Sequence, residues 1–296
     1  MKHERFLAWC LSTPWALMPE RMSSYAQVLA RKSAGGMDED DHGAPLKQAG
    51  PAKRGPARSG AIAVIPVHGT IVQRSNQIDM CEGGTSTTAV SAMLADAMAD
   101  SSVAQILLDI DSPGGSVYGV QELAAEIQAS SKPVVAFANS LAASAAYWIG
   151  AAASEFHVTP GGEVGSIGVW TAHQDVSAAL KEAGVNVTLI SAGEFKVEGN
   201  PYGPLSTEAH AFMQSRIDDY YAAFTQGVAK GRKVSVADVR GNMGKGRVFG
   251  AQQALAANMV DSVSTRDQVI ARMQKTIKAG GMNRMAVAER ELKIRG

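Results

Sequence analysis

The chain has 296 residues, of which 46% are hydrophobic and 19% are charged, so it can bury a sizeable core and is not wholly disordered. Its 28 basic residues balance its 28 acidic residues, so it lacks the basic excess of a dedicated nucleic-acid binder. Two cysteines, Cys10 and Cys81, are too few for a disulfide framework or a zinc cluster and fit a reducing compartment, so we expect no metal site.

Two segments precede the first regular pattern. Residues 1–30 contain the apolar stretch FLAWCLSTPWALM, which is interrupted by Pro14 and lacks a convincing cleavage site, so we favour a short docking helix over a signal peptide. Residues 31–60 hold six glycines, three prolines and runs of both charges, which is typical of a flexible linker. The sequence therefore predicts an N-terminal arm and a linker before the main domain.

From Ala61 onward, strand-like and helix-like segments alternate. The expected strands are 61–72, 103–110, 133–138, 155–159 and 185–190, and the expected helices are 86–100, 120–130, 142–153, 176–184 and 206–231. Segment 249–263 adds one more helix and a last strand, and 276–296 is expected to be a loosely held tail. The alternation predicts an α/β domain over 61–275 with a mainly parallel sheet and right-handed crossovers.

One uncharged stretch, residues 133–154, is long enough to cross a bilayer. It is rich in Ala and Ser rather than Leu and Ile, and it contains Asn139. We therefore expect a buried strand followed by a buried helix, and no membrane span.

Ser144 stands inside this stretch, in ANSLAASAAYW. We expect a strand to end near Ala138 and a helix to begin about three residues before Ser144. A serine at such a junction gains from the helix dipole as a nucleophile, and the N–H of Ala145 would be an oxyanion donor. A serine in an alanine-rich helix is also a common packing residue, and the sequence at this point leaves both interpretations open.

The stretch DSPGGS contains a second candidate element, the pair Gly114–Gly115. Two glycines between a strand and a helix let backbone N–H groups point outward, where they can bind an anion or a developing oxyanion. The alternative is an ordinary tight turn.

The general base is less obvious. None of the six histidines stands in a clear Ser–His–Asp order with Ser144, although His173 is not dismissed. Lys196, in SAGEFKVEGNPYGPLS, is the other candidate. A lysine acts as a base only where burial lowers its pKa, and a single loop lysine is more often solvated.

Four motifs together resemble a known family. In chain order they are DSPGG, ANSLAASAAYWIGAAA, GGEVGSIGVW and FKVEGNPYGPLS, and the resemblance covers roughly 61–265. They are similar to the signal peptide peptidase A family of Ser–Lys peptidases, which share the Clp protease and crotonase type of fold. The resemblance implies a Clp protease/crotonase-like α/β fold built from repeated ββα and βαβ units.

The resemblance also implies roles for particular residues. Ser144 would be the nucleophile, Lys196 the general base, and Ser166 the hydroxyl that orients the lysine amine. The implied oxyanion hole consists of Gly115 and Ala145, with Gly114 shaping the turn. No cofactor is implied.

Within this family, WALMPERM and KVEGNPYGPLS resemble the phage head maturation proteases. This likeness implies a protein substrate, the capsid scaffold, together with homo-oligomers, capsid or portal partners, and a place in the phage prohead or host cytoplasm. A bacterial cytoplasmic or prophage-encoded enzyme is the alternative. Because the chain ends shortly after the last expected strand, we expect any scaffold to be a separate polypeptide.

Three other functions stay open. A bacterial signal-peptide-peptidase-like protease would use the same residues. A crotonase-type acyl-CoA enzyme would need a pocket carboxylate, for which Glu155 and Glu163 are the nearest candidates. A capsid protein that lost its chemistry would need neither Ser144 nor Lys196.

The helix expected at 206–231 carries the aromatic-rich stretch FMQSRIDDYYAAF. Tyr220, Tyr221 and Phe224 are candidates for a subunit interface. Packing against the domain's own sheet is equally favoured.

Overall fold

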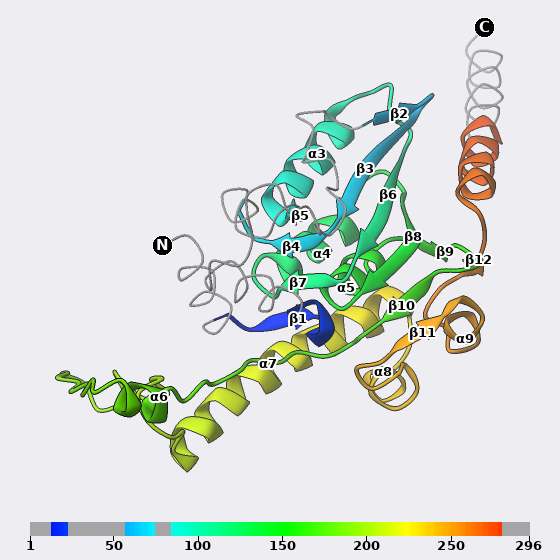
Figure 1. Cartoon of the computed structure of the whole chain (residues 1–296). Coiled ribbons are helices and arrows are strands. Elements are labelled where there is room, and N and C mark those ends of the chain that lie inside the picture. The colour runs from blue at the N-terminus through cyan, green and yellow to red at the C-terminus, as the bar shows by residue number, and fades with distance from the viewer. Residues whose placement is uncertain (1–12, 23–56, 75–83, 280–296) are drawn as a thin grey trace, which may run out of the picture.

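The computed structural model describes residues 13–22, 57–74 and 84–279 (Figure 1). Most of the predicted N-terminal segment 1–30 and of the linker 31–60 lies outside these ranges. Both cysteines and all residues from 280 onward also lie outside them. The domain boundaries near 30, 60 and 275 therefore stay predictions.

An eight-stranded sheet forms the centre of the domain. Its path is β11–β10–β8–β6–β3–β2, and β9 pairs with both β8 and β12. The strands are β2 (Ala57–Ser59), β3 (Ile62–His68), β6 (Gln105–Ser112), β8 (Val134–Ala143), β9 (Glu155–Val158), β10 (Glu163–Gly165), β11 (Val248–Gly250) and β12 (Ser262–Val263). Two pairings, β2–β3 and β10–β11, are antiparallel and the others are parallel, which confirms the mainly parallel sheet.

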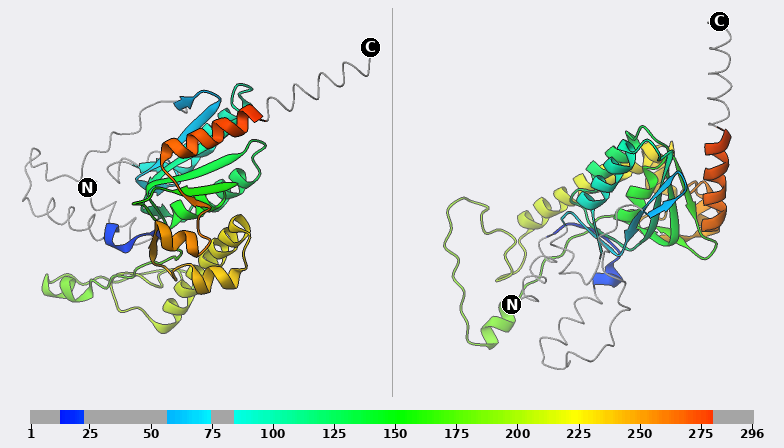
Figure 2. Two further views of the ribbon diagram at one scale, coloured as in Figure 1. Left: turned by 90° about the vertical axis from the view of Figure 1, so that its right-hand side faces the viewer. Right: turned by 90° about the horizontal axis from the view of Figure 1, so that it is seen from above.

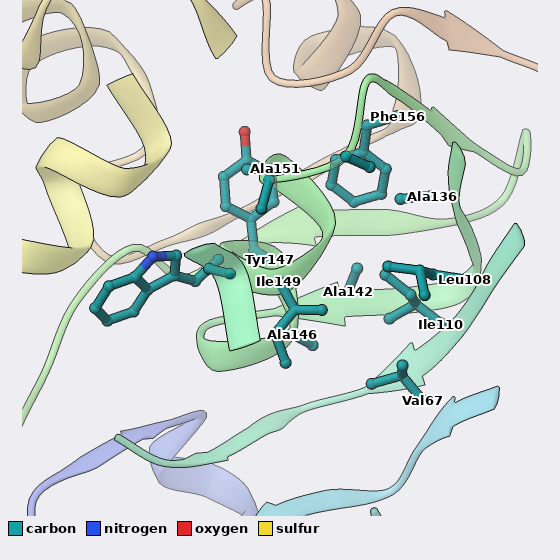
Figure 3. Packing of buried hydrophobic residues seen from close by; sticks show 14 of the residues in the cluster. Val67, Leu108, Ile110, Ala136, Ala142, Ala146, Tyr147, Ile149, Ala151 and Phe156 are labelled. Atoms are coloured by element: carbon teal, nitrogen blue, oxygen red, sulfur yellow. The ribbon is translucent and has the colours of Figure 1, made fainter. Parts of the chain in front are cut away.

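Both faces of this sheet are covered, which explains why its central strands are almost continuously apolar. Helices α3 (Thr87–Ala99), α4 (Val120–Gln128) and α5 (Ala145–Ala151) lie on one face, and a helix over 266–279 lies on the other (Figures 1 and 2). Successive residues of a strand point to opposite faces, so Ile65 of β3 joins the larger core and Ile62 packs in a second cluster with Val269. Figure 3 shows part of the larger core around α5.

A second, four-stranded sheet stands at the carboxyl ends of β3 and β6. Its order is β1 (Trp15–Leu17), β7 (Gly114–Ser116), β4 (Thr70–Val72) and β5 (Gly84–Ser86). Since β4 follows β3 and β7 follows β6 along the chain, the loops after the parallel strands gather at this edge. Open α/β folds place their ligand sites at such an edge.

The remaining helices are α6 (Ser177–Glu182), α7 (Thr207–Arg232), α8 (Val236–Asn242) and α9 (Ala251–Ala256). Ser206 caps α7 by accepting a hydrogen bond from the N–H of Ala209. The expected helix and last strand within 249–263 are also confirmed, as α9 and β12. Within the described ranges, no helix is both long enough and apolar enough to cross a membrane.

Two local expectations are wrong. Strand β8 runs on to Ala143, so the helix α5 begins directly after Ser144 rather than before it. The segment 185–190 forms no strand but runs exposed, with Ile190 95% accessible. Among the described residues, no strand pairs with this segment, although its apolar residues alternate.

This exposed segment belongs to a long excursion that we call the arm, residues 176–206. Two hydrogen bonds join the two ends of the arm, which we call its neck. The N–H of Val176 donates to the carbonyl of Pro201 (2.8 Å), and His173 Nε2 bonds the carbonyl of Asn200 (3.0 Å). The arm, with α6, and the first turns of α7 stand away from the body (Figures 1 and 2). The arm therefore offers a surface that its own domain leaves uncovered.

The second half of α7 packs on the domain instead. Phe224 is fully buried, and its ring stacks on that of Trp148 with centroids 4.8 Å apart. Tyr220 meets Tyr118 edge to face, and Tyr221 lies under Arg240. The proposed interface role is therefore wrong for Phe224, which belongs to the core of its own chain.

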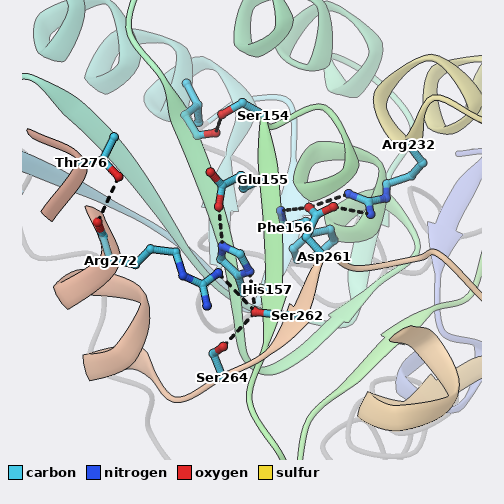
Figure 4. A network of polar contacts seen from close by, with 11 residues as sticks. Ser154, Glu155, Phe156, His157, Arg232, Asp261, Ser262, Ser264, Arg272 and Thr276 are labelled. Atoms are coloured by element: carbon cyan, nitrogen blue, oxygen red, sulfur yellow. Dashed lines mark hydrogen bonds and ion pairs between the residues drawn. The ribbon is translucent and has the colours of Figure 1, made fainter. Parts of the chain in front are cut away.

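A buried polar network on β9 predicts a pH-dependent stability (Figure 4). His157 is 1% exposed and bonds Ser262 Oγ through Nδ1 (2.9 Å) and Glu155 through Nε2 (3.1 Å). Burial, followed by the nearby Arg272, lowers the pKa of His157 below its ordinary 6.5. The unfolded chain therefore binds this proton more readily, and the free energy of unfolding should fall as the pH drops below about 6.5.

Thermal unfolding of the wild type and of His157→Gln between pH 7.5 and 5 measures this effect. The variant should lose part of the pH dependence in that window. Parallel curves for the two proteins would rule out His157 as its source.

Candidate active site

Ser144 has an unusual backbone conformation. It connects the end of β8 to the start of α5 with φ 58° and ψ −119°. Residues with a Cβ rarely adopt such positive φ values, and holding one there costs about 1–3 kcal/mol. Its N–H donates to the carbonyl of Gly165 (2.7 Å), and its carbonyl accepts from Trp148 (3.0 Å), so the neighbouring elements fix the turn. A sharp strand–turn–helix junction of this kind presents the nucleophile in α/β-hydrolases.

The Ser144 hydroxyl has no hydrogen-bond partner among the described residues, although the residue is only 1% exposed. A buried hydroxyl without a partner costs about 1–3 kcal/mol. A buried polar group without a partner is typical of a functional site, so Ser144 is a candidate functional residue.

Gly114 lies directly beside Ser144. A Cβ at this position would collide with the carbonyl oxygen of Ala16 and would stand 2.8 Å from Ser144 Cβ, and its φ of 97° suits glycine alone. The Gly114 N–H donates to Ser112 Oγ (3.2 Å). Gly115 is in contact with β4, where a Cβ would collide with the carbonyl of Ile71. The glycine pair thus brings bare backbone next to the serine.

Two further predicted residues also lie at this junction. Ala145 is the first residue of α5 and is fully buried. Its N–H is one of the first N–H groups of the helix, which have no acceptor within the helix itself. Ser166 directly follows Gly165, whose carbonyl bonds Ser144, and it too has a positive φ, of 53°. The fold therefore gathers Ser144, Ser166 and the three predicted oxyanion residues in one region.

The predicted base is not part of this group. Lys196 lies exposed in the arm, where its N–H bonds the carbonyl of Gly193 (3.2 Å). His173 is at the neck of the arm and bonds Asn200, so it does not replace Lys196 as a partner of Ser144. Within one described chain, Ser144 has neither candidate base as a hydrogen-bond partner.

The carboxylates that an acyl-CoA enzyme would need are also elsewhere. Glu155 is exposed and bonds His157, and Glu163 is exposed on β10. Neither forms a hydrogen bond with Ser144. The crotonase-type alternative therefore gains no support from the geometry.

The sequence interpretation missed one element at the site. The N-terminal apolar stretch was expected to dock as a helix, but residues 15–17 form the strand β1, paired with β7 beside Gly114. The indole N–H of Trp170 donates to the carbonyl of Leu17 (2.8 Å). A pairing between residues about a hundred positions apart leaves no local signal beyond the short apolar run itself.

Comparison with known proteins gives matches over the same region. The sequence profile of Clp protease matches residues 70–161, and that of peptidase family S49 matches residues 126–280. The chain is 37% identical over 220 residues to capsid assembly protease C of Escherichia phage lambda. The aligned region covers 74% of this chain and 50% of that protein. It is 37% identical over 234 residues to the head-tail preconnector protein GP5 of Enterobacteria phage P21, covering 77% and 46% respectively.

Protease 4 of Haemophilus influenzae is a more distant relative, 27% identical over 73% of this chain and 35% of that protein. The chain thus spans about half the length of the two phage proteins and about a third of this one. The S49 profile covers more than half of the chain and includes Ser144, Ser166 and Lys196. The chain therefore belongs to peptidase family S49, on a Clp protease-like fold.

Proposed function

We propose that the chain is a serine endopeptidase in which Ser144 forms an acyl-enzyme with the substrate. The observation that carries this proposal is the Ser144 junction itself. A buried hydroxyl without a partner is held in a strained conformation, next to a glycine pair and at the start of a helix. Strain and an orphaned polar group together cost stability, which is typical of a functional site.

The proposed chemistry needs a base, an electrophile and an oxyanion site. Ser144 Oγ bonds to the scissile carbonyl carbon while its proton moves to the neutral amine of Lys196, which Ser166 orients. The carbonyl oxygen becomes an oxyanion near the N–H of Ala145 and the Gly114–Gly115 backbone. The C–N bond then breaks as the lysine proton passes to the leaving amine, and water releases the acyl group by the same steps.

We infer that Lys196 reaches Ser144 from a second copy of the chain. The arm that carries Lys196 exposes apolar side chains that its own domain leaves uncovered; these are Val185, Val187, Leu189, Ile190, Phe195 and Tyr202. Exposed apolar surface on a projecting segment favours contact with another protein surface. Within the described part of one chain, Ser144 has no base as a partner and the apolar side chains of the arm are uncovered, and a second copy meets both requirements. The peptidase would then be a homo-oligomer.

The phage relatives suggest the substrate. A capsid assembly protease and a head-tail preconnector protein share 37% identity with this chain. We therefore propose a head maturation protease that digests scaffold protein during capsid assembly, in the phage prohead or host cytoplasm, with capsid or portal proteins as partners. A bacterial protease of the protease 4 type is the second candidate. It is favoured by the 27% identity to protease 4 of Haemophilus influenzae, which extends over 73% of this chain.

Labelling with a fluorophosphonate tests the proposed peptidase. The wild-type chain should gain one probe, mapped to Ser144 by peptide mass spectrometry, and should hydrolyse an unfolded protein such as casein. Ser144→Ala should gain none. A wild-type protein that is folded and oligomeric, yet neither labels nor hydrolyses, would overturn the proposal.

A further inference from the structure

Strand β1 lies between two other extended segments of the chain. On one edge it pairs antiparallel with β7, with Ala16 opposite Gly115. On the other edge the backbones of Trp15 and Trp170 exchange two hydrogen bonds, of 2.8 and 2.9 Å. All three β1 residues are buried. The strand is thus paired along one edge with β7 and is held on the other edge by the backbone of Trp170.

This strand runs past the nucleophile. The carbonyl oxygen of Ala16 and the Cβ of Ser144 border the same residue, Gly114, and both would contact a Cβ placed there. Strand β7 is paired with β4 along one edge and with β1 along the other. Any extended peptide that presents a carbonyl to Ser144 along β7 would therefore have to take the position of β1.

The bonds that hold β1 are largely independent of sequence. Beyond the strand itself, the N–H of Met18 donates to the carbonyl of Pro113 (3.1 Å), and the N–H of Val117 donates to the carbonyl of Pro14 (3.3 Å). Such backbone pairing is the way in which proteins bind extended peptides by strand addition. The slot can accordingly accept another extended chain in the same register.

We propose that the slot between β7 and Trp170 is the substrate groove and that β1 is its internal occupant, which must leave before substrate binds. This inference rests on the proposed role of Ser144. It also defines the substrate more closely. Ala16 is completely buried opposite Gly115, so the groove takes an extended segment with a small side chain at that position.

The test uses the full chain and a dye-labelled peptide with the sequence of residues 13–20, TPWALMPE. Both proteins carry Ser144→Ala, so that no cleavage occurs, and one also carries Ala16→Pro. Proline removes the N–H that pairs with Gly115 and is not tolerated inside a central strand. By fluorescence anisotropy, the Ala16→Pro protein should bind the peptide about tenfold more tightly or better, because its slot is vacated.

Two controls sharpen the result. Ala16→Gly keeps the N–H and should bind the peptide as weakly as the parent protein. A peptide with leucine at the Ala16 position should bind poorly to every protein. Equal peptide affinity of a folded Ala16→Pro protein and its parent would overturn the inference.

A second measurement covers the case in which Ala16→Pro does not fold. With Ser144 intact and β1 unaltered, the unlabelled peptide should raise the apparent KM for a short fluorogenic substrate and leave kcat unchanged. Inhibition that lowers kcat instead, or no inhibition, contradicts the proposal. The binding assay needs no catalysis, so a failure of Ser144 to react with a fluorophosphonate would overturn the proposed function alone.

Discussion

Replacing Ser144 with alanine is expected to abolish peptide hydrolysis while leaving the fold intact. Losing the nucleophile costs on the order of 10⁶ in kcat in the best-studied serine protease. The substitution removes only the hydroxyl oxygen, which has no partner in the described chain, so no donor or acceptor is left unsatisfied. The free energy of unfolding should stay equal or rise slightly, since the orphaned hydroxyl is itself costly.

The measurement compares hydrolysis of a fluorogenic peptide with the thermal unfolding midpoint. Ser154→Ala is a matched control, because Ser154 also lies at a junction between a strand and α5. Its hydroxyl donates to the carbonyl of Val134 (2.6 Å) and is not part of the proposed active site. The control should keep full activity and lose a little stability. Near-normal hydrolysis by purified Ser144→Ala would remove this serine from the mechanism.

Lys196→Arg is expected to be nearly as inactive as Lys196→Ala. Arginine keeps the positive charge but cannot deprotonate at working pH, so it cannot accept the serine proton. A general base contributes about 10²–10⁴-fold to the rate, and both variants should lose activity of that order. Because Lys196 is exposed, neither substitution should change the unfolding midpoint. Good activity in the arginine variant would reduce Lys196 to a positive charge.

Mixing two inactive variants tests whether the lysine comes from another copy. Ser144→Ala retains Lys196, and Lys196→Ala retains Ser144. After dissociation and joint reassembly, an equimolar mixture should recover about one quarter of the wild-type rate, because one random junction in four joins both intact residues. No recovered activity in mixed oligomers, verified by differently tagged copies, would show that each chain uses its own lysine.

The sequence predicts the parts of the site that depend on local patterns. The apolar runs that end near Ile110 and Ala138 predict parallel strands, and the Pro–Gly–Gly sequence after the first of them predicts the turn where Gly114 lies. The exact start of α5 is not predicted, because alanine suits both the end of β8 and the first turn of a helix.

Long-range features could not be predicted in this way. The segment 185–190 has the alternation of a strand, but a strand also needs an edge to pair with, and no strand within the described ranges pairs with it. The pairing of β1 with β7 joins residues far apart in sequence, and nothing in Trp15–Leu17 alone specifies it. Both features depend on surfaces that form only once the rest of the domain has folded.

The projection of the arm also has a kinetic consequence. If each working site combines residues from two copies, a solitary chain carries both Ser144 and Lys196 but cannot bring them together. In dilute solution the rate then grows with the square of the chain concentration and becomes linear only when copies are mostly associated. A newly made copy would be inactive on its own and would complete its reactive pair only where many copies are crowded together.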